Sequence, residues 1–135
     1  MVGSSVSVNR KYIQMEIGKR NWVIAEGYIP EESTGPAPEF TSHETACILN
    51  AGKTDAKVEI FIYFSDKPPS GPYHVTVPAQ RTMHLRFNEL DNPQIPRGTD
   101  YSSVLISDQP VVVQHSRLDS RQAENALLTT IAYSE

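Results

Sequence analysis

Short stretches in which every second residue is apolar are the feature that most constrains the fold of this chain. In residues 81–87, for example, Met83, Leu85 and Phe87 alternate with polar side chains. Successive side chains of an extended strand point to opposite faces, so this period of two indicates a strand with one buried and one wet face. A helix of similar length would need apolar residues three and four positions apart.

Stretches of this kind recur along most of the chain and are separated by segments rich in Pro, Gly, Asn and Asp. Such segments are typical of turns. We therefore predict about eight strands, at residues 22–26, 45–50, 57–64, 73–77, 81–87, 102–107, 111–116 and 125–133. The last stretch also fits a helix by spacing, but Thr129, Thr130 and Tyr133 favour a strand. The predicted fold class is all-β, an antiparallel β-sandwich or a jelly-roll-like barrel.

The size of the chain indicates one domain. Its 135 residues, 39% of them hydrophobic, suffice for a single core. We place this domain at residues 18–135 and treat residues 1–17 as an N-terminal extension, either an edge strand or a tail. The longest apolar run, residues 60–64, is far shorter than the roughly 20 residues of a membrane-spanning helix.

Composition also indicates where the protein works. We find no secretory signal, and the single cysteine, Cys47, cannot form a disulfide within the chain. We therefore expect a soluble cytoplasmic protein with no membrane insertion. A formal net charge of −4 argues against broad attraction to nucleic acid or anionic lipid, because such attraction needs clustered Lys and Arg.

The motifs that usually mark enzymes are not found. The sequence has no phosphate-binding glycine loop, dinucleotide-binding fingerprint or nucleophile elbow. His43 and Glu44 begin like the helical zinc-protease signature, but Cys47 stands where the second histidine belongs, and this segment is predicted to enter a strand. We interpret Cys47 as a small buried hydrophobe. The four histidines lie on separate segments without metal-ligand spacing, so we expect no metal and no cofactor.

The densest polar run is residues 115–125, which contains Arg117, Asp119, Arg121 and Glu124. Its arginines can hold a carboxylate, a phosphate or the acidic patch of a partner. The interpretation that we favour is structural: the two arginines pair with Asp119 and Glu124 and fix a loop or a subunit contact. Trp22 and the tyrosines can likewise form a sugar-stacking platform, but the apolar neighbours of Trp22 favour core packing.

Several blocks of the sequence resemble the sensory rhodopsin transducer family. They include WVIAEGYIP at residues 22–30, FTSHET at 40–45, CILNAG at 47–52, YFSDK at 63–67 and RLDSRQAENALL at 117–128. The resemblance extends over about residues 18–133, and the long polar block that begins at Arg117 is its most specific part. The preceding extension lies outside it.

The resemblance implies a small β-sandwich-like protein that assembles as a homotetramer and carries no cofactor. It implies a membrane rhodopsin as partner, bound at its cytoplasmic face. Relatives also occur in bacteria without an evident rhodopsin, and there the likeness of the fold to sugar-binding modules implies a carbohydrate or another small ligand. We therefore expect a non-enzymatic signalling or interaction protein, with a carbohydrate-binding module as the alternative.

The residues expected to contact a partner or ligand lie in the resembling blocks. They are Glu26, Tyr28, His43, Glu44, His115, Arg117, Asp119 and Arg121. None is assigned a catalytic role. An enzyme remains a competing hypothesis if His43, Glu44, His115 and Arg117 converge in one pocket. DNA binding by an assembled basic face is a further, weaker hypothesis.

Overall fold

The computed structural model describes residues 16–34, 36–37, 41–122 and 126–135, which form an all-β structure. This confirms the predicted fold class. The elements are β1 (Lys19–Tyr28), β2 (His43–Asn50), β3 (Ala56–Phe64), β4 (Ser70–Val77), β5 (Arg81–Arg86), the 3₁₀ turn η1 (Phe87–Glu89), β6 (Asp100–Asp119), β7 (Ala126–Ile131) and β8 (Tyr133–Ser134). No helix in these ranges has the length and hydrophobicity needed to cross a membrane.

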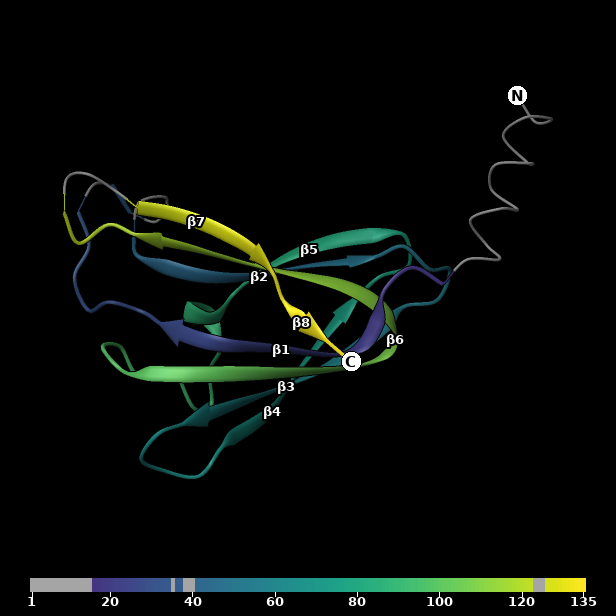
Figure 1. Cartoon of the computed structure of the whole chain (residues 1–135), viewed down its shortest axis with the longest axis horizontal. Coiled ribbons are helices and arrows are strands. Elements are labelled where there is room, and N and C mark those ends of the chain that lie inside the picture. Colours follow the sequence, from purple (N-terminus) through teal and green to yellow (C-terminus); the bar gives the residue numbers. More distant parts are fainter. Residues whose placement is uncertain (1–15, 35, 38–40, 123–125) are drawn as a thin grey trace.

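The strands form two layers that share β6 (Figure 1). Sheet A has the order β4-β3-β6-β1-β8, and sheet B has the order β7-β6-β2-β5. Every pair of neighbouring strands is antiparallel. The two sheets are therefore joined through the backbone of one strand as well as through side-chain packing.

The 20-residue strand β6 changes partners near its middle. Residues 101–107 pair with β1 and β3, whereas residues 112–118 pair with β2 and β7. Asn21 of β1 lies opposite Ile106, but Lys19, only two residues away, lies opposite Val111. The extra residues of β6 form a wide bulge, which bends the strand from one sheet into the other.

The predicted separation of residues 102–107 and 111–116 into two strands is therefore wrong. Residues 108–110 were expected to form a turn, but they form the bulge because side chains of β1 satisfy its backbone carbonyls. Arg20 Nη1 donates to the Asp108 carbonyl at 2.5 Å, and the Trp22 indole N–H donates to the Val111 carbonyl at 3.0 Å. The Asp108 carboxylate in turn accepts a hydrogen bond from the Lys57 N–H of β3 at 2.8 Å. Pro110 has no N–H that needs a partner.

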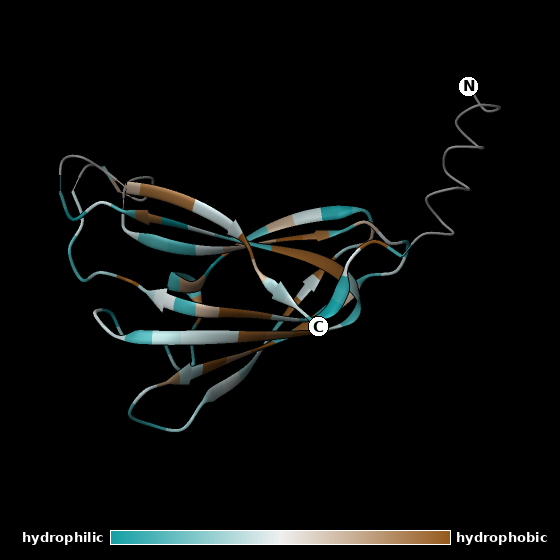
Figure 2. Ribbon diagram, viewed as in Figure 1, coloured by the Kyte–Doolittle hydropathy of each residue, from teal (hydrophilic) through white to brown (hydrophobic). Residues whose placement is uncertain are grey.

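The hydrophobic core lies between the two sheets. Its most buried side chains include Ile48, Ile60, Ile62, Leu105 and Val113. Each comes from the inward face of an alternating strand, and hydrophobic and polar segments alternate along the ribbons accordingly (Figure 2). Trp22 is only 4% exposed, which confirms that it packs in the core.

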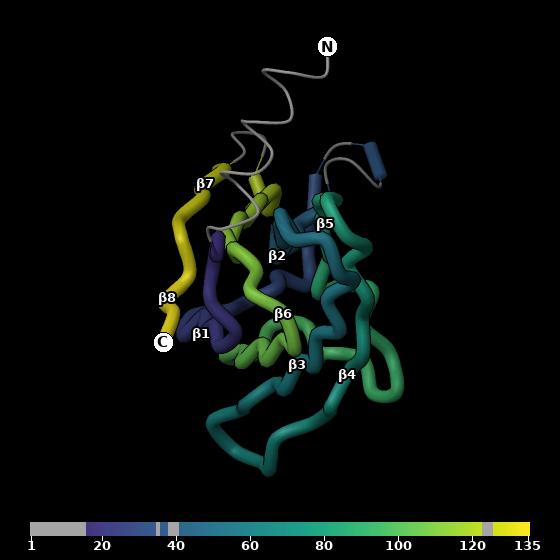
Figure 3. The backbone as a smooth tube through the Cα atoms, turned by 90° about the vertical axis from the view of Figure 1, so that its right-hand side faces the viewer, coloured from purple at the N-terminus to yellow at the C-terminus, as the bar shows by residue number. Residues whose placement is uncertain are grey.

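The C-terminal segment connects the two sheets along one side of the molecule (Figure 3). Strand β7 is an edge of sheet B, β8 is an edge of sheet A, and the buried Ala132 between them donates its N–H to the Val113 carbonyl. The predicted final strand is confirmed as a strand but is divided at Ala132. The extension at residues 1–17, with its predicted edge strand, lies almost wholly outside the described residues.

Gly18 provides a test of the β6 bend. Its φ is +107°, and a Cβ added there would lie 2.2 Å from the Val111 carbonyl oxygen. Gly18→Ala should therefore lower the free energy of unfolding by about 2 kcal/mol or more. Gly52→Ala is the control, because its Cβ would meet only the Asn50 Oδ1 atom, at 3.3 Å. Urea unfolding measures both, and equal losses would show that the Gly18 contact does not constrain the bend.

Candidate functional site

The buried carboxylate of Glu44 is the centre of the candidate site. Glu44 shares the inward face of β2 with Ala46 and Ile48, and it is 1% exposed. A carboxylate in such a place is costly unless strong donors surround it. Oε2 accepts hydrogen bonds from the Tyr28 N–H at 2.6 Å and from Arg117 Nε at 2.8 Å, and Oε1 lies 2.7 Å from His115 Nε2.

Strand register brings these groups together. Glu44 lies directly opposite Arg117 across the β2–β6 pair, and Ala46 lies opposite His115. His115 and Arg117 are two residues apart on β6, so both point to the same side of the sheet as Glu44. The alternation that fills the core with hydrophobic residues thus places three polar side chains at one end of it.

Arg117 connects this buried group to the surface. Its Nη2 lies 2.6 Å from Glu44 Oε2 and also donates to Glu26 Oε1 of β1. The Glu26 side chain is 65% exposed, whereas that of Arg117 is 18% exposed. We call Glu26, Glu44, His115 and Arg117 the Glu44 cluster. It bridges sheet B to sheet A, because Glu44 belongs to β2 and Glu26 to β1.

The charges of the cluster determine the state of Arg117. Burial by itself lowers the pKa of the Arg117 guanidinium, but the hydrogen bond to Glu26 and the charge of Glu44 outweigh burial. The net pKa of Arg117 is therefore above its ordinary value, and the side chain remains a cation. A permanent cation between two carboxylates stabilises the link between the sheets.

Tyr101 of β6 borders the cluster. Its ring meets Phe87 edge-on with a centroid separation of 5.9 Å, and a Cβ at position 27 would lie 2.6 Å from this ring. Gly27 therefore leaves the space that the ring needs. The Tyr101 hydroxyl is buried without a hydrogen-bond partner among the described residues. Burial, with a further contribution from the negative charge of Glu44, raises the pKa of Tyr101 far above its ordinary value.

A second polar group covers the outside of this end. Arg121 Nη2 lies 2.6 Å from Asp119 Oδ2, and the Arg121 guanidinium lies 5.7 Å from the centre of the Tyr28 ring. The hydrogen bond from Arg121 lowers the pKa of Asp119. We call Tyr28, Asp119 and Arg121 the outer rim. Tyr28 links the rim to the Glu44 cluster, since its N–H donates to Glu44.

Hydrogen bonds tie the loop after β1 to the turn after β6. Thr34 Oγ1 donates to the Ser120 carbonyl at 2.7 Å, and the hydroxyls of Ser42 and Ser120 lie 3.0 Å apart. Ser120 is 0% exposed. These bonds fix the backbone at the position where Asp119 and Arg121 leave β6.

The structure thus brings seven of the eight predicted residues together at one end of the molecule, whereas His43 lies at the same end but on the other face of sheet B. His43 is on the opposite face of β2 from Glu44 and lines a groove on the outside of sheet B. The sequence predicted that Arg117 and Arg121 pair with Asp119 and Glu124. Arg121 does pair with Asp119. Arg117 does not, because it binds Glu44 and Glu26 instead. Glu124 lies outside the described residues.

The side chains proposed for an enzyme do not share one accessible pocket. Glu44 and His115 are in contact but are only 1% and 4% exposed, and His43 faces away from them. Within the described ranges, His, Cys, Asp and Glu nowhere gather in threes with the geometry of a metal site.

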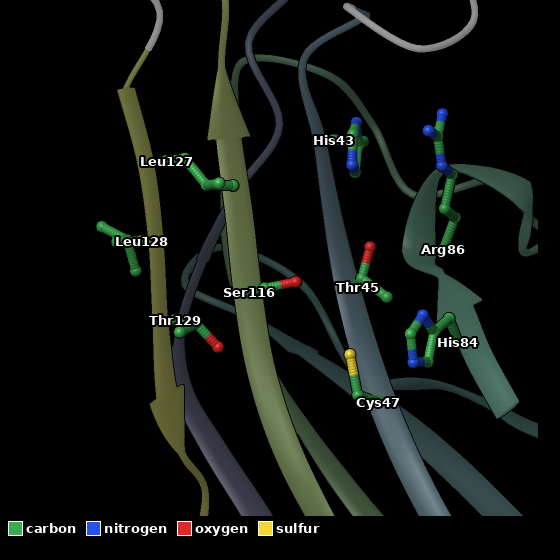
Figure 4. Close-up of a pocket in the computed structure, with 9 residues that line it drawn as sticks. All are labelled: His43, Thr45, Cys47, His84, Arg86, Ser116, Leu127, Leu128 and Thr129. Carbon is green, nitrogen blue, oxygen red and sulfur yellow. The ribbon is translucent and has the colours of Figure 1, made fainter. Parts of the chain in front are cut away.

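The groove on sheet B was not anticipated from the sequence (Figure 4). It has a volume of about 660 Å³ and is lined by residues of four neighbouring strands: His43, Thr45, Cys47, His84, Arg86, Ser116, Leu127, Leu128 and Thr129. We call it the outer groove. Cys47 is half-buried on this outward face, so its assignment as a buried hydrophobe is wrong.

A second cleft, of about 430 Å³, lies on the opposite side of the molecule, on sheet A. Glu26, Tyr63, Phe64, Asp100 and Tyr101 are among its lining residues. Tyr63 is 46% exposed. The ammonium group of Lys67 lies 4.5 Å from the centre of the Phe64 ring, so a cation already occupies one aromatic face.

Glu44→Gln tests the central role of the buried carboxylate. The substitution keeps the side-chain shape but removes the charge that Arg117 and His115 face, so it should lower the free energy of unfolding by about 3 kcal/mol. The matched control is Glu26→Gln, which removes the exposed partner of the same arginine and should cost less than about 1 kcal/mol. Both values come from urea unfolding at pH 7. A Glu26→Gln loss as large as that of Glu44→Gln would contradict this assignment.

Comparisons with known proteins identify the family of this chain. The profile of the family described as "Anabaena sensory rhodopsin transducer" matches residues 17–134. A solved structure of the Anabaena sensory rhodopsin transducer is 61% identical, with a TM-score of 0.68, and the match covers 75% of this chain and 98% of that one. The crystal structure of Thermotoga maritima 1070 is 39% identical, with a TM-score of 0.77 and coverage of 87% and 96%. No curated protein matches the chain. The chain therefore belongs to the sensory rhodopsin transducer family.

Proposed function

We propose that this protein is a non-enzymatic signal transducer that binds the cytoplasmic face of a sensory rhodopsin and works as a homotetramer in the cytoplasm. Family membership supports the signalling role. The observation that carries the proposed contact site is the position of the outer rim, which places exposed charged side chains directly over the buried Glu44 cluster.

The outer rim and Glu26 are the proposed contact residues. Arg121 and Glu26 are both exposed, so a partner can reach a cation and a carboxylate on one surface. Glu44, His115 and Arg117 act beneath them as positioning residues. Because the protein has a net charge of −4, anionic lipid repels it, and binding at a membrane needs basic residues on the receptor.

Arg117 connects the contact surface to the buried Glu44 carboxylate. Its guanidinium holds Glu26 of sheet A and Glu44 of sheet B at the same time. A basic group of the receptor that binds Glu26 competes with Arg117 for that carboxylate, which loosens the link between the sheets. A change at the contact surface thereby becomes a change in how the two layers are connected.

The outer face of sheet A is the proposed subunit interface. The strand registers place Tyr133, Val23, Val104 and Phe61 side by side across four strands. Ile106 lies on the same face and is 41% exposed, and Tyr133 is 62% exposed. A continuous apolar surface of this kind is typical of subunit contacts.

A carbohydrate-binding module is the second candidate function, and the cleft on sheet A favours it. The half-exposed ring of Tyr63 offers a stacking surface, and the carboxylates of Glu26 and Asp100 offer acceptors for sugar hydroxyls. Binding on a glycan array that Tyr63→Ala abolishes would favour this function over that of a rhodopsin transducer.

The receptor contact is tested by titrating the protein against the sensory rhodopsin encoded by the same genome, held in lipid nanodiscs. Calorimetry should detect binding, and Arg121→Ala should weaken it at least tenfold because a charged contact is removed at the centre of the surface. Arg81→Ala, an exposed change at the far end of sheet B, is the control. The rhodopsin proposal fails if there is no heat of binding, or if both variants bind equally well.

The assembly is tested by light scattering coupled to size-exclusion chromatography. The wild-type protein should have the mass of four 15.1 kDa chains, and Val104→Glu should reduce it because a charge is placed in the apolar row. Thr76→Glu, on exposed β4, should leave the mass unchanged. A monomeric wild-type protein would argue against the tetramer. A tetrameric Val104→Glu variant would show that the subunit interface does not lie on the outer face of sheet A.

A further inference from the structure

The outer groove has a floor of hydroxyl groups. Across three neighbouring strands, Thr45 lies opposite Ser116, and Ser116 lies opposite Thr129. Their side chains point to the outer face of sheet B, and Thr45 is only 6% exposed although it faces outward (Figure 4). Thr129 Oγ1 donates to the His115 carbonyl oxygen at 3.0 Å, so the hydroxyls that this floor offers as donors to a polar ligand are those of Thr45 and Ser116.

Three basic side chains line the groove. His84 is exposed and lies opposite Cys47 across the β2–β5 pair, and His43 and Arg86 line the same groove. No Asp or Glu is among the described residues that line it. In a protein with a net charge of −4, such a lining is an exception, and it favours an anionic ligand.

The orientation of the His43 ring also suits an anionic ligand. Its Nδ1 lies 2.7 Å from the Thr41 carbonyl oxygen, and because a carbonyl only accepts, Nδ1 must carry a hydrogen. The other nitrogen, Nε2, remains for a ligand. To donate to an anion, Nε2 must gain a proton, so anion binding at His43 is coupled to proton uptake.

One wall of the groove is apolar. Leu127 and Leu128 of the edge strand β7 line it and are 75% and 48% exposed. Exposed leucines beside a polar floor fit a ligand that has an apolar part next to its charged group.

We propose that the outer groove binds a small organic anion that carries a short apolar chain. The anionic group lies against His43 and the hydroxyl floor, and the chain lies against Leu127, which is in the same row as His43 across β2, β6 and β7. The volume of about 660 Å³ is within the usual range for a small-molecule site. This site is separate from the proposed rhodopsin contact, so either can fail without the other.

The probe for this site is 1-butanesulfonate, whose charge does not change with pH. The ring signals of the four histidines are followed by NMR during the titration. Those of His43 should shift and saturate at millimolar probe. Those of His74, which is 70% exposed on sheet A, should not. The neutral 1-butanol and the cationic butylammonium should produce no saturable shift.

Two variants separate the charged and apolar contacts. His43→Gln should weaken butanesulfonate binding at least tenfold, whereas His74→Gln should leave it unchanged. Leu127→Ser should reduce the affinity for butanesulfonate to that for methanesulfonate, because the contact with the chain is lost. His74 and Leu127 are exposed and His43 is half-buried, and circular dichroism checks that each variant is folded.

Proton coupling provides an independent readout. The titratable and charged side chains of the groove around His43 are Cys47 on β2, and His84 and Arg86 on β5, whereas β6 and β7 contribute Ser116, Leu127, Leu128 and Thr129 to it. Butanesulfonate should therefore bind more tightly at pH 6 than at pH 8. Equal shifts at His74, equal binding of butanol or butylammonium, an affinity independent of pH, or no saturation at tens of millimolar would overturn the proposal.

Discussion

The membership of β6 in both sheets is the constraint on which the rest of the structure depends. Because one strand pairs with β1 and β3 and then with β2 and β7, the two layers are held in a fixed relation by backbone hydrogen bonds. The bulge that allows this needs Gly18 against the Val111 carbonyl and the Trp22 indole as a donor. The second half of β6 then delivers His115 and Arg117 to the buried carboxylate of Glu44. The candidate site is thus a consequence of the same bend that joins the sheets.

Burying the Glu44 carboxylate costs desolvation free energy, and the hydrogen-bond donors that surround this carboxylate offset that cost. Its exposed end, Glu26, is the only member of the cluster that a partner can readily reach, and Arg117 connects it to the interior. The two faces of sheet B consequently have different properties. The inward face holds fixed charges that are satisfied within the protein, whereas the outward face presents hydroxyl, imidazole and leucine side chains along the outer groove.

Much of the fold could be predicted because alternation is a local signal. Met83 and Leu85 pack on the core and Thr82 and His84 are exposed, as the spacing indicates. The division of residues 102–116 into two strands failed, because Asp108 and Pro110 are typical of turns and the side chains that satisfy this backbone, Arg20 and Trp22, come from distant β1. The pairing of Arg117 failed for a related reason: Asp119 is close in sequence, but Glu44 is opposite in the sheet.

The sequence by itself determined the strand class, the inward and outward faces of most strands and, through its resembling blocks, the family. These properties depend on the order of neighbouring residues. Only the tertiary structure decided that Glu44 is buried against His115 and Arg117, that His43 faces away from them, and that His43, His84 and Leu127 share a groove. Those arrangements depend on strand register and on the bend in β6, which are set by contacts between residues up to about 90 positions apart, such as Trp22 with Val111.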